Sequence, residues 1–297
     1  MKITILGCGA LGMLWLVALN RQGHYIQGWL KVPRSTCDVK VINVKEKKED
    51  RLQFLANNEK HLSESNLLLV ALKAWQISKS VKKLLPKLRT DCIILLLHNG
   101  LGAYEELLPI LVQPLVIGIT THAVYREDNK IYHVNNGITF IGPGNVKAKS
   151  LRIITTQLLN SSLPEVIWHD NITAISWIKF AANCIINPLT AIYNCRNGLL
   201  ERYSKEVETV CREITLLMNR EGFHFHHESL LIYIKQIIHC TENNFSSMLQ
   251  DIRANRKSEI DYITGYALRR AHLHGISLPK NQRIFDQIKK KERFNYV

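Results

Sequence analysis

The sequence predicts an α/β region followed by a helical region, and the order of its apolar segments indicates this arrangement. The chain begins with a short apolar run, Ile3 to Leu6, which leads through glycines into a helical pattern. Further apolar runs typical of buried parallel strands follow. Beyond Asp170 long helical periodicity takes over. We therefore expect an N-terminal α/β domain over residues 1–170 and an all-helical C-terminal domain over residues 171–297.

The individual elements follow from the same patterns. Strands are expected at residues 25–30, 66–72, 92–97, 114–120 and 166–168, short edge strands and loops at 39–56, and helices at 74–86, 150–159 and 171–194. The pair Asn136-Gly137 is typical of a type I′ turn, so antiparallel strands are expected between residues 125 and 143, covering one edge. Pro188 is expected to end or kink the last of these helices after Asn187.

The segment Gly7-Cys8-Gly9-Ala10-Leu11-Gly12 lies between the first strand and the first helix. In that context G-x-G-x-x-G predicts a Rossmann-type dinucleotide-binding domain. The first glycine allows a tight turn, the second lets a pyrophosphate approach the backbone, and the third lets helix and strand pack closely. The alternative is an ordinary strand–turn–helix connection.

The end of the second predicted strand bears on which dinucleotide binds. NAD enzymes carry an acid roughly 20 residues beyond the glycines, which holds the ribose 2′-hydroxyl. This chain has Lys31 and Arg34 there and no acid before Asp38. A cation suits a 2′-phosphate, so NADPH is expected rather than NADH; the alternative is a solvated lysine. Lys73 and Asn99 follow two buried strands and are further cofactor-side candidates, with plain turn residues as the alternative.

Composition sets limits on the other classes of function. The formal net charge of +14 could indicate nucleic acid, but the lysines are scattered, so we expect a solvated basic surface without nucleic-acid or membrane partners. No run approaches the roughly 18 apolar residues of a membrane helix. Seven cysteines without a C-x-x-C motif indicate reduced thiols and a cytoplasmic protein. The cluster His224, His226, His227 and Glu228 has no clean ligand spacing, so no metal site is expected.

Two stretches of the helical region carry chemically capable side chains. Lys179, Asn183 and Asn187 are spaced by four residues and share one helix face amid apolar neighbours. Ser247-x-x-Gln250 has the form of a capping box, so Ser247 could simply cap a helix. Glu259 opens the next helical run and alone would be an ordinary acid of a first turn.

Five blocks resemble those of ketopantoate reductase (2-dehydropantoate 2-reductase): GCGALG, LLLVALKAWQ, LLLHNGLG, KFAANCIINPLTAIYNC and NNFSSMLQDIRANRKSEIDYITG. The resemblance implies NADPH-dependent reduction of ketopantoate to (R)-pantoate, in pantothenate and coenzyme A biosynthesis. It implies Lys179 as general acid with Glu259 as a second catalytic residue. The implied substrate contacts are Lys179, Asn183, Asn187, Asn244, Ser247 and Asn99, and the implied cofactor contacts are Gly7, Cys8, Gly9, Ala10, Leu11, Gly12, Lys31, Lys73, Asn99, Ala123 and Glu259.

One position departs from the family's pattern, because Lys31 stands where close members have arginine. A lysine is a point charge without the bidentate fork of arginine, so the preference for NADPH is expected to survive in weaker form. The rival interpretations are a reductase of another 2-oxo acid and an NADPH-sensing protein that has no use for Lys179 and Glu259. We expect a monomer or a homodimer.

Overall fold

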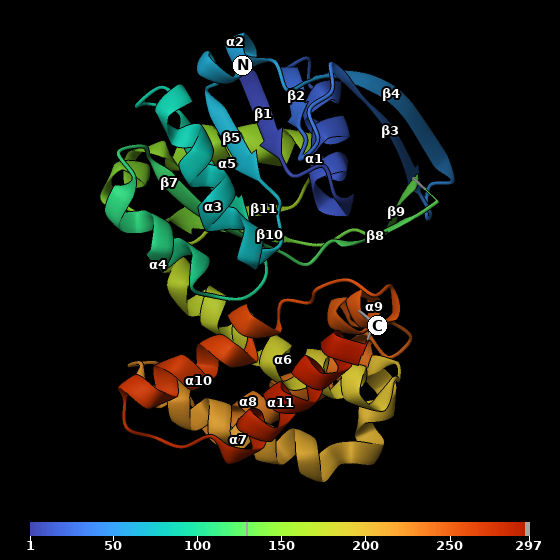
Figure 1. Ribbon diagram of the computed structural model, residues 1–297, viewed down its shortest axis with the longest axis vertical. Helices are drawn as coiled ribbons and strands as arrows, with labels where there is room; N and C mark the ends of the chain where they lie inside the picture. Colours follow the sequence, from blue (N-terminus) through green and yellow to red (C-terminus); the bar gives the residue numbers. More distant parts are fainter. Residues whose placement is uncertain (129, 295–297) are drawn as a thin grey trace. The chain divides into compact units, whose positions relative to one another are not determined.

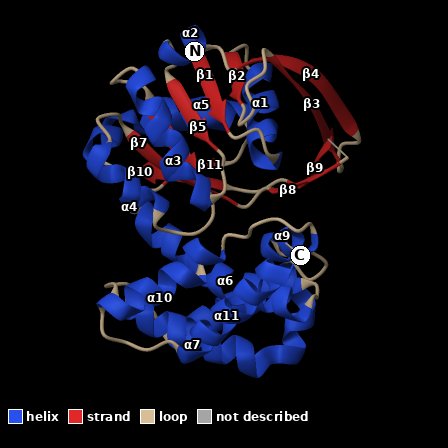
Figure 2. Cartoon of the chain, in the orientation of Figure 1, coloured by secondary structure: helices blue, strands red, loops and turns tan. Residues whose placement is uncertain are grey.

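The computed structural model describes residues 1–128 and 130–294, and the chain divides into two compact units (Figure 1). The first unit comprises Met1–His98 and Ala103–Ile175, and the second comprises Asn99–Gly102 and the chain from Ser176 onward. Among the described residues every strand belongs to the first unit, and the second is helical (Figure 2). The predicted fold class is therefore confirmed, while the boundary at residue 170 stays a prediction.

The first unit is built on one sheet, which has eleven strands among the described residues in the order β11-β10-β7-β6-β5-β1-β2-β4-β3-β9-β8. The strands are β1 (Lys2–Leu6), β2 (Tyr25–Trp29), β3 (Thr36–Asn43), β4 (Lys48–Ala56), β5 (Leu67–Val70), β6 (Ile93–Leu97), β7 (Leu115–Thr120), β8 (Ala123–Glu127), β9 (Lys130–Asn135), β10 (Thr139–Pro143) and β11 (Val166–Trp168). The helices of this unit are α1 (Ala10–Arg21), α2 (Glu59–Ser63), α3 (Ala74–Leu84), α4 (Ala103–Leu107) and α5 (Arg152–Ser162), with the 3₁₀ turns η1 (Leu85–Lys87), η2 (Leu108–Ile110) and η3 (Val146–Leu151).

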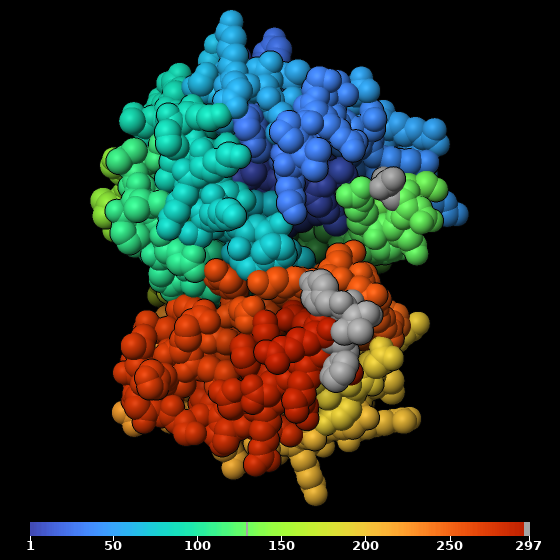
Figure 3. Space-filling model, viewed as in Figure 1, coloured from blue at the N-terminus to red at the C-terminus, as the bar shows by residue number. Residues whose placement is uncertain are grey.

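The centre of the sheet is parallel, because β1 pairs with β2 and β5, and β6 pairs with β5 and β7 in the same direction. All four residues of β5 and all five of β6 are buried, which explains their continuous apolar runs. The first segment of the chain, dark blue in Figure 3, is largely covered by later segments, and residues 12–19 of α1 are all buried. The glycine-rich connection between β1 and α1 is therefore held on both sides by rigid core elements.

The prediction of short edge strands over residues 39–56 is wrong. β3 and β4 are long, form an antiparallel hairpin and lie inside the sheet, where β4 pairs with β2 and β3 pairs with β9. Cys37, Val39 and Val41 are buried while the residues between them are less so, which is the alternation of a half-buried strand. The many lysines and acids on the other face hid this alternation in the sequence.

The type I′ turn expected at Asn136-Gly137 is also wrong. These residues join β9 to β10, which do not pair with each other: β9 pairs with β8 and β3, and β10 with β7 and β11. Antiparallel pairing does occur here, between β8 and β9 and between β7 and β10. Gly137 is required for another reason, since a Cβ atom there would lie 2.4 Å from the amide nitrogen of His122.

The second unit is a cluster of helices around α6. Its helices are α6 (Ile172–Tyr193), which begins in the first unit, α7 (Ser204–Arg220), α8 (His227–Cys240), α9 (Ser247–Arg253), α10 (Thr264–Leu273) and α11 (Pro279–Phe294), with the 3₁₀ turns η4 (Asn197–Tyr203) and η5 (Ile260–Tyr262). Contrary to expectation, α6 is long and apolar enough to cross a membrane by length and composition. Because 61% of its most apolar stretch of 18 residues is buried inside the protein, α6 is better explained as a core helix.

Helix α6 continues through Pro188 to Tyr193, so of the two outcomes expected at Pro188, an end or a kink of the helix, the end is wrong. Proline removes one backbone donor and crowds the preceding turn. Here the nearby carbonyl groups of Ile186 and Asn187 lie 2.8 and 2.9 Å from the hydroxyl of Thr190. That hydroxyl also contacts the hydroxyl of Ser246 at 2.7 Å. These contacts join the turn after Pro188 to Ser246, which lies far along the chain.

Candidate active site

The glycine-rich connection has the geometry that close approach of a phosphate group requires. Gly7 has φ +101°, and a Cβ atom on it would lie 2.6 Å from the carbonyl oxygen of Ala71. A Cβ atom on Gly12 would lie 1.9 Å from the carbonyl oxygen of Gly7, whereas one on Gly9 would meet nothing within 4 Å. The first and third glycines thus serve packing, and the second faces open space.

The N-terminus of α1 follows directly on this open space. Gly9 is the N-cap residue, and no side chain among the described residues caps the helix there. The first N–H groups of a helix lack intrahelical partners and carry a partial positive charge. An anion such as a pyrophosphate is stabilised at such a position.

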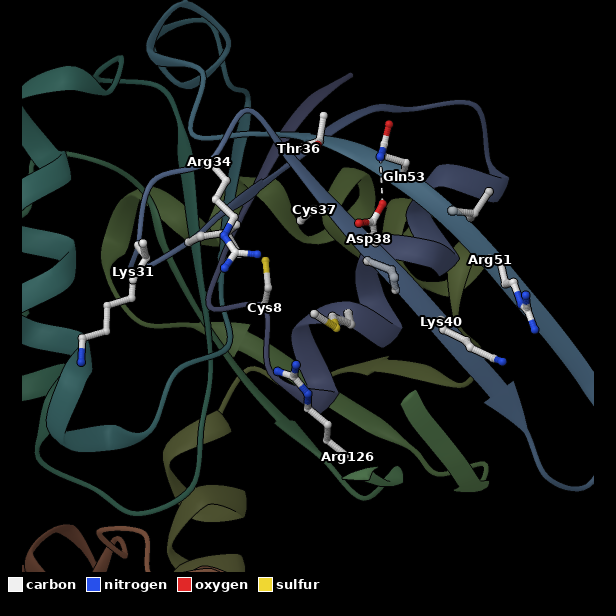
Figure 4. A pocket seen from close by; sticks show the side chains of 15 residues that line it. Cys8, Lys31, Arg34, Thr36, Cys37, Asp38, Lys40, Arg51, Gln53 and Arg126 are labelled. Atoms are coloured by element: carbon white, nitrogen blue, oxygen red, sulfur yellow. Dashed lines mark hydrogen bonds between the residues drawn. The ribbon is translucent and has the colours of Figure 1, made fainter. Parts of the chain in front are cut away.

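A pocket of about 790 Å³ opens beside this connection, at the carboxyl end of β2 (Figure 4). It is lined by Cys8, Met13, Leu30, Lys31, Val32, Arg34, Thr36, Cys37, Asp38, Val39, Lys40, Arg51, Leu52, Gln53 and Arg126. Five of these side chains are cationic and one is acidic. Lys40 forms an ion pair with Glu49 at 3.1 Å, and Arg51 also pairs with Glu49, so their charge is partly neutralised.

The remaining cations of the lining define a basic region, formed by Lys31, Arg34 and Arg126. Lys31 and Arg34 are exposed in the connection from β2 to β3, and Arg126 comes from β8 (Figure 4). In a doubly wound sheet the adenosine ribose of a dinucleotide lies at this strand end, and cations there can contact a 2′-phosphate. The residues present therefore fit a phosphorylated dinucleotide, with its pyrophosphate at the N-terminus of α1.

In the second unit, Lys179 and Glu259 interact. Lys179 lies on α6 and is half-buried, and Glu259 precedes η5 and is 4% exposed. Burial lowers the pKa of Lys179 to about 8, and the charge of Glu259 opposes that decrease. A lysine with such a pKa is still mostly protonated at neutral pH but gives up its proton readily, which suits a general acid.

The two asparagines of the same helix face are joined to each other. Nδ2 of Asn187 donates a hydrogen bond to Oδ1 of Asn183 at 3.3 Å. Asn187 is buried and Asn183 is half-buried. The polar face of α6 thus carries two features beside the apolar core that contains Trp177 and Phe180: the interaction of Lys179 with Glu259 and the bond between the two asparagines.

The capping role suggested for Ser247 is wrong. Ser246 is the N-cap residue of α9, and its Oγ accepts a hydrogen bond from the amide of Leu249 at 3.1 Å. Ser246 is buried against Thr190, whereas Ser247 is exposed. Ser247 is therefore not needed to start the helix, and Asn244, exposed three residues earlier, lies in the same connection.

The remaining residues named from the sequence occupy different positions. Lys73 is the N-cap residue of α3, and Ala123 is the first residue of β8. Asn99 belongs to the second unit, and in the same short segment the amide of Leu101 donates a hydrogen bond to the carbonyl of Tyr262 at 2.9 Å. Gly100, with φ +77°, allows this approach, since a Cβ atom there would lie 2.5 Å from the same carbonyl oxygen.

The histidine cluster does not come together as a metal site. His224, His226 and Glu228 are exposed as expected, but His227 is half-buried, and both of its ring nitrogens are buried without a hydrogen-bond partner among the described residues. Within residues 1–128 and 130–294 no group of three or more His, Cys, Asp or Glu side chains could hold a metal ion. That the protein works without a metal stays a prediction.

Sequence reasoning missed Arg126, Cys37 and Ser246. Arg126 reaches the pocket only because β8 pairs with β9 and β9 with β3, a topology that no local pattern indicates. Cys37 could have been found from the alternation of buried residues along β3. Ser246 was overlooked because the box pattern fits Ser247 one residue later.

The fold has a sheet with a parallel centre, the glycine-rich connection and a basic pocket, followed by helices that carry a lysine of lowered pKa. These features define a nicotinamide-dinucleotide-dependent oxidoreductase. The model of the family "Ketopantoate reductase PanE/ApbA" matches residues 3–145, and that of its C-terminal domain matches residues 171–292. The chain belongs to the ketopantoate reductase family.

Individual relatives agree with this assignment. A 2-dehydropantoate 2-reductase of Yersinia pestis is 51% identical over 293 residues, which cover 98% of this chain and 95% of the relative. The crystal structure of a PanE/ApbA family ketopantoate reductase from Ralstonia eutropha JMP134 is 22% identical and has a TM-score of 0.89, with 100% of both chains covered. A ternary structure of D-mandelate dehydrogenase with NADH and anilino(oxo)acetate is 20% identical, with a TM-score of 0.88 and the same full coverage. The fold alone therefore does not fix the substrate.

Proposed function

We propose that this chain is a 2-dehydropantoate 2-reductase that uses NADPH to reduce ketopantoate to (R)-pantoate, a step of pantothenate and coenzyme A biosynthesis. The observation that carries the proposal is Lys179, held opposite Glu259 with its pKa lowered to about 8, in a chain 51% identical to a reductase of this name. An NADPH sensor would have no use for this pair. Reduction of a different 2-oxo acid is the rival within the same fold.

The proposed chemistry of Lys179 follows from its charge. When bound, the reduced nicotinamide supplies the hydride that reaches C2 of the substrate. Negative charge then grows on the ketone oxygen, and the ammonium group of Lys179 stabilises that charge and donates a proton to the oxygen. Glu259 keeps the ammonium group protonated, because its charge raises the pKa against the effect of burial.

The uncharged polar residues are proposed to bind the substrate. Asn183, Asn187, Asn244, Ser247 and Asn99 offer amide and hydroxyl groups to the hydroxyl and carboxylate of ketopantoate. Neutral donors bind a carboxylate without bringing a second negative charge to the site. The bond between Asn187 and Asn183 fixes the orientation of the two amides that stand beside Lys179 on α6.

The preference for NADPH is proposed from the basic region of the pocket. Lys31 and Arg34 line it where an NAD enzyme would carry an acid, and Arg126 adds a third cation from another strand. The fork of Arg34 or Arg126 can supply the bidentate contact that Lys31 cannot. Gly7, Cys8, Gly9, Ala10, Leu11 and Gly12 would hold the pyrophosphate, and Lys73, Ala123, Asn99 and Glu259 are proposed along the rest of the cofactor.

The cellular context is proposed with the same function. A biosynthetic reductase with free cysteines fits the cytoplasm, and its partners are its small-molecule substrate and cofactor, without nucleic acid, membrane or metal. A monomer or a homodimer remains the expectation for its assembly.

The test is a steady-state assay of NADPH oxidation with ketopantoate beside pyruvate and phenylglyoxylate. We expect kcat/KM for ketopantoate to exceed that for the other acids by about a hundredfold or more, a difference of about 2.7 kcal/mol. Lys179→Ala should lower kcat by about 10²–10⁴-fold while NADPH binding persists. Lys235→Ala, which removes an exposed lysine from α8, is the matched control. Binding of NADPH without turnover of any 2-oxo acid would leave the sensor as the better interpretation.

A further inference from the structure

Two cysteines from distant parts of the sequence meet at the edge of the basic pocket. Cys8 belongs to the glycine-rich connection and Cys37 to β3. The sulfur atoms lie 2.8 and 2.9 Å from the position that a Cβ atom on Gly28 would occupy. Both therefore converge on the same small space above β2, which is open only because residue 28 is glycine. Both cysteines also line the pocket (Figure 4).

The two thiols are chemically unequal. The side-chain interaction between them raises the pKa of Cys8 and lowers the pKa of Cys37. Burial raises the pKa of Cys8 further, while Arg126 acts in the opposite direction. Asp38 opposes ionisation of Cys37. The Cys37 sulfur is thus the one that becomes a thiolate first.

The other cysteines lack these features. Burial raises the pKa of Cys92 to about 12 and that of Cys211 to about 11, which keeps both thiols protonated and unreactive. Cys240 is exposed at the end of α8. In the described part of the chain, Cys8 and Cys37 are the one pair of cysteines that affect each other in this way: the largest effect on the pKa of each thiol comes from the other.

We propose that Cys8 and Cys37 are a peroxide-sensitive pair whose oxidation to a disulfide ties the glycine-rich connection to β3 and weakens dinucleotide binding. The effect on the dinucleotide rests on the proposed function; the oxidation itself does not.

The reaction balances with hydrogen peroxide as the oxidant. The Cys37 thiolate attacks one peroxide oxygen, the O–O bond breaks, and the released hydroxide takes up a proton to become water. The Cys37 sulfur is now a sulfenic acid. The Cys8 sulfur, having lost its proton to this leaving hydroxyl group, attacks the Cys37 sulfur and forms the S–S bond, and a second water leaves. Two thiols have been oxidised by two electrons and one peroxide has been reduced to two waters.

The consequence for binding follows from where Cys8 lies. Its neighbours Gly7 and Gly9 carry the backbone that a pyrophosphate must approach, and Gly7 is already confined by Ala71. A bond to β3 removes the freedom of the connection to adjust around the phosphates. It also moves the Cys8 side chain within the pocket that its sulfur lines.

The experiment treats the full-length protein with hydrogen peroxide and then compares peptide masses and NADPH binding. We expect a Cys8–Cys37 cross-linked peptide, two fewer titratable thiols, and NADPH affinity about tenfold weaker or more, reversed by dithiothreitol. Cys240→Ser, the matched control, should form the same cross-link. Cys37→Ser should form none and should keep its own NADPH affinity to within about threefold after peroxide.

The outcomes separate this inference from the proposed function. Reduced protein that binds NADPH but yields no Cys8–Cys37 peptide overturns the pair as an oxidation site. A cross-link that leaves NADPH affinity unchanged overturns its effect on binding. Reduced protein that fails to bind NADPH would instead overturn the proposed cofactor, and the cross-link would then be judged from the peptide masses alone.

Discussion

Glu259 acts on Lys179 within the helical unit, and its charge raises the lysine pKa that burial lowers to about 8. Lys179, the proposed general acid, loses its proton as the pH rises through about 8, and kcat/KM for ketopantoate should fall about tenfold per pH unit above that value. In Glu259→Gln the carboxylate no longer supports the ammonium ion, so the fall should begin at a lower pH. The check is kcat/KM between about pH 6 and 10 for both proteins. A fall that starts at the same pH in the variant would contradict the pairing.

The glycine-rich connection allows a matched pair of substitutions. In Gly9→Ala the added Cβ atom has no other atom within 4 Å, so the variant should fold normally. Its methyl group enters the space proposed for the pyrophosphate, so NADPH affinity should fall about tenfold or more. Gly12→Ala would force a Cβ atom to 1.9 Å from the carbonyl oxygen of Gly7 and should lower thermal stability. Calorimetry and NADPH titration on both variants test this. Equal loss of stability in the two would show that the three glycines serve packing alone.

Cofactor choice should depend on the charge beside β2. Lys31→Glu brings a carboxylate to the basic region, where it repels a 2′-phosphate and can accept from a ribose hydroxyl. The ratio of kcat/KM for NADPH to that for NADH should fall about tenfold or more. Lys60→Glu, at an exposed position of α2, makes the same charge change elsewhere and should leave the ratio unaltered. If the unmodified protein has nearly equal kcat/KM values for NADPH and NADH, the proposed preference for NADPH is wrong.

Adjacent serines should have different roles. Ser246→Ala removes the N-cap of α9 and the contact with Thr190, and should lower the free energy of unfolding by about 1–2 kcal/mol. Ser247→Ala removes an exposed hydroxyl and should change stability by less than about 0.5 kcal/mol. If Ser247 binds ketopantoate, its loss should instead raise KM. Urea unfolding and steady-state kinetics measure the two effects separately, and an unchanged KM would exclude Ser247 from the substrate site.

The buried pair His122 and His133 should make the first unit sensitive to acid. Nδ1 of His122 and Nε2 of His133 are 3.1 Å apart, and burial lowers the pKa of His122 to about 4, with a further contribution from His133. Because this pKa lies below its unfolded value of 6.5, stability is fully present above pH 6.5. It is lost as the pH falls toward 4, by at most about 3 kcal/mol.

His122→Asn tests this dependence, because asparagine can still accept the hydrogen bond that the amide of Gly137 donates to His122 at 3.1 Å but cannot be protonated. The difference in unfolding free energy between pH 7 and pH 4.5 should shrink in this variant. The exposed His224→Asn should behave like the unmodified protein. The same pH dependence in all three proteins would rule out His122 as its source.

The sequence predicted those parts of the fold that local patterns determine. β5 and β6 are continuous apolar runs because both faces are buried, and the glycines between β1 and α1 lie in the strand–glycine–helix order that predicts a dinucleotide-binding domain. The hairpin of β3 and β4 was missed because its exposed face is rich in charge and its partners, β2 and β9, are distant in the sequence. Pro188 lies inside α6 although proline usually ends a helix, and the local pattern does not show the packing of that turn, which includes the contact of Thr190 with Ser246 far along the chain.

The candidate site likewise contains residues that local patterns predict and residues that only the tertiary fold brings into place. The common face of Lys179, Asn183 and Asn187 follows from helical spacing, since one helix carries all three. The approach of Glu259 to Lys179 depends on how α6 and η5 pack, and only the family resemblance anticipated it. Arg126 had no local signal, because strand pairing across the sheet brings it to the pocket, whereas the alternation along β3 could have indicated Cys37.

The hydrogen bond from the amide of Leu101 to the carbonyl of Tyr262 limits how the chain can be recombined with a related one. Asn99–Gly102 belong by contact to the helical unit although the chain on either side of them belongs to the first unit. A hybrid made by a single genetic crossover near residue 175 would therefore take its C-terminal helices from one parent and Gly100, which contacts those helices, from the other. Any side chain in place of Gly100 would collide with the Tyr262 carbonyl. Such a hybrid should therefore fold only when the parent that supplies residues 1–175 carries glycine at position 100, because the carbonyl it must approach is present whichever parent supplies residue 262.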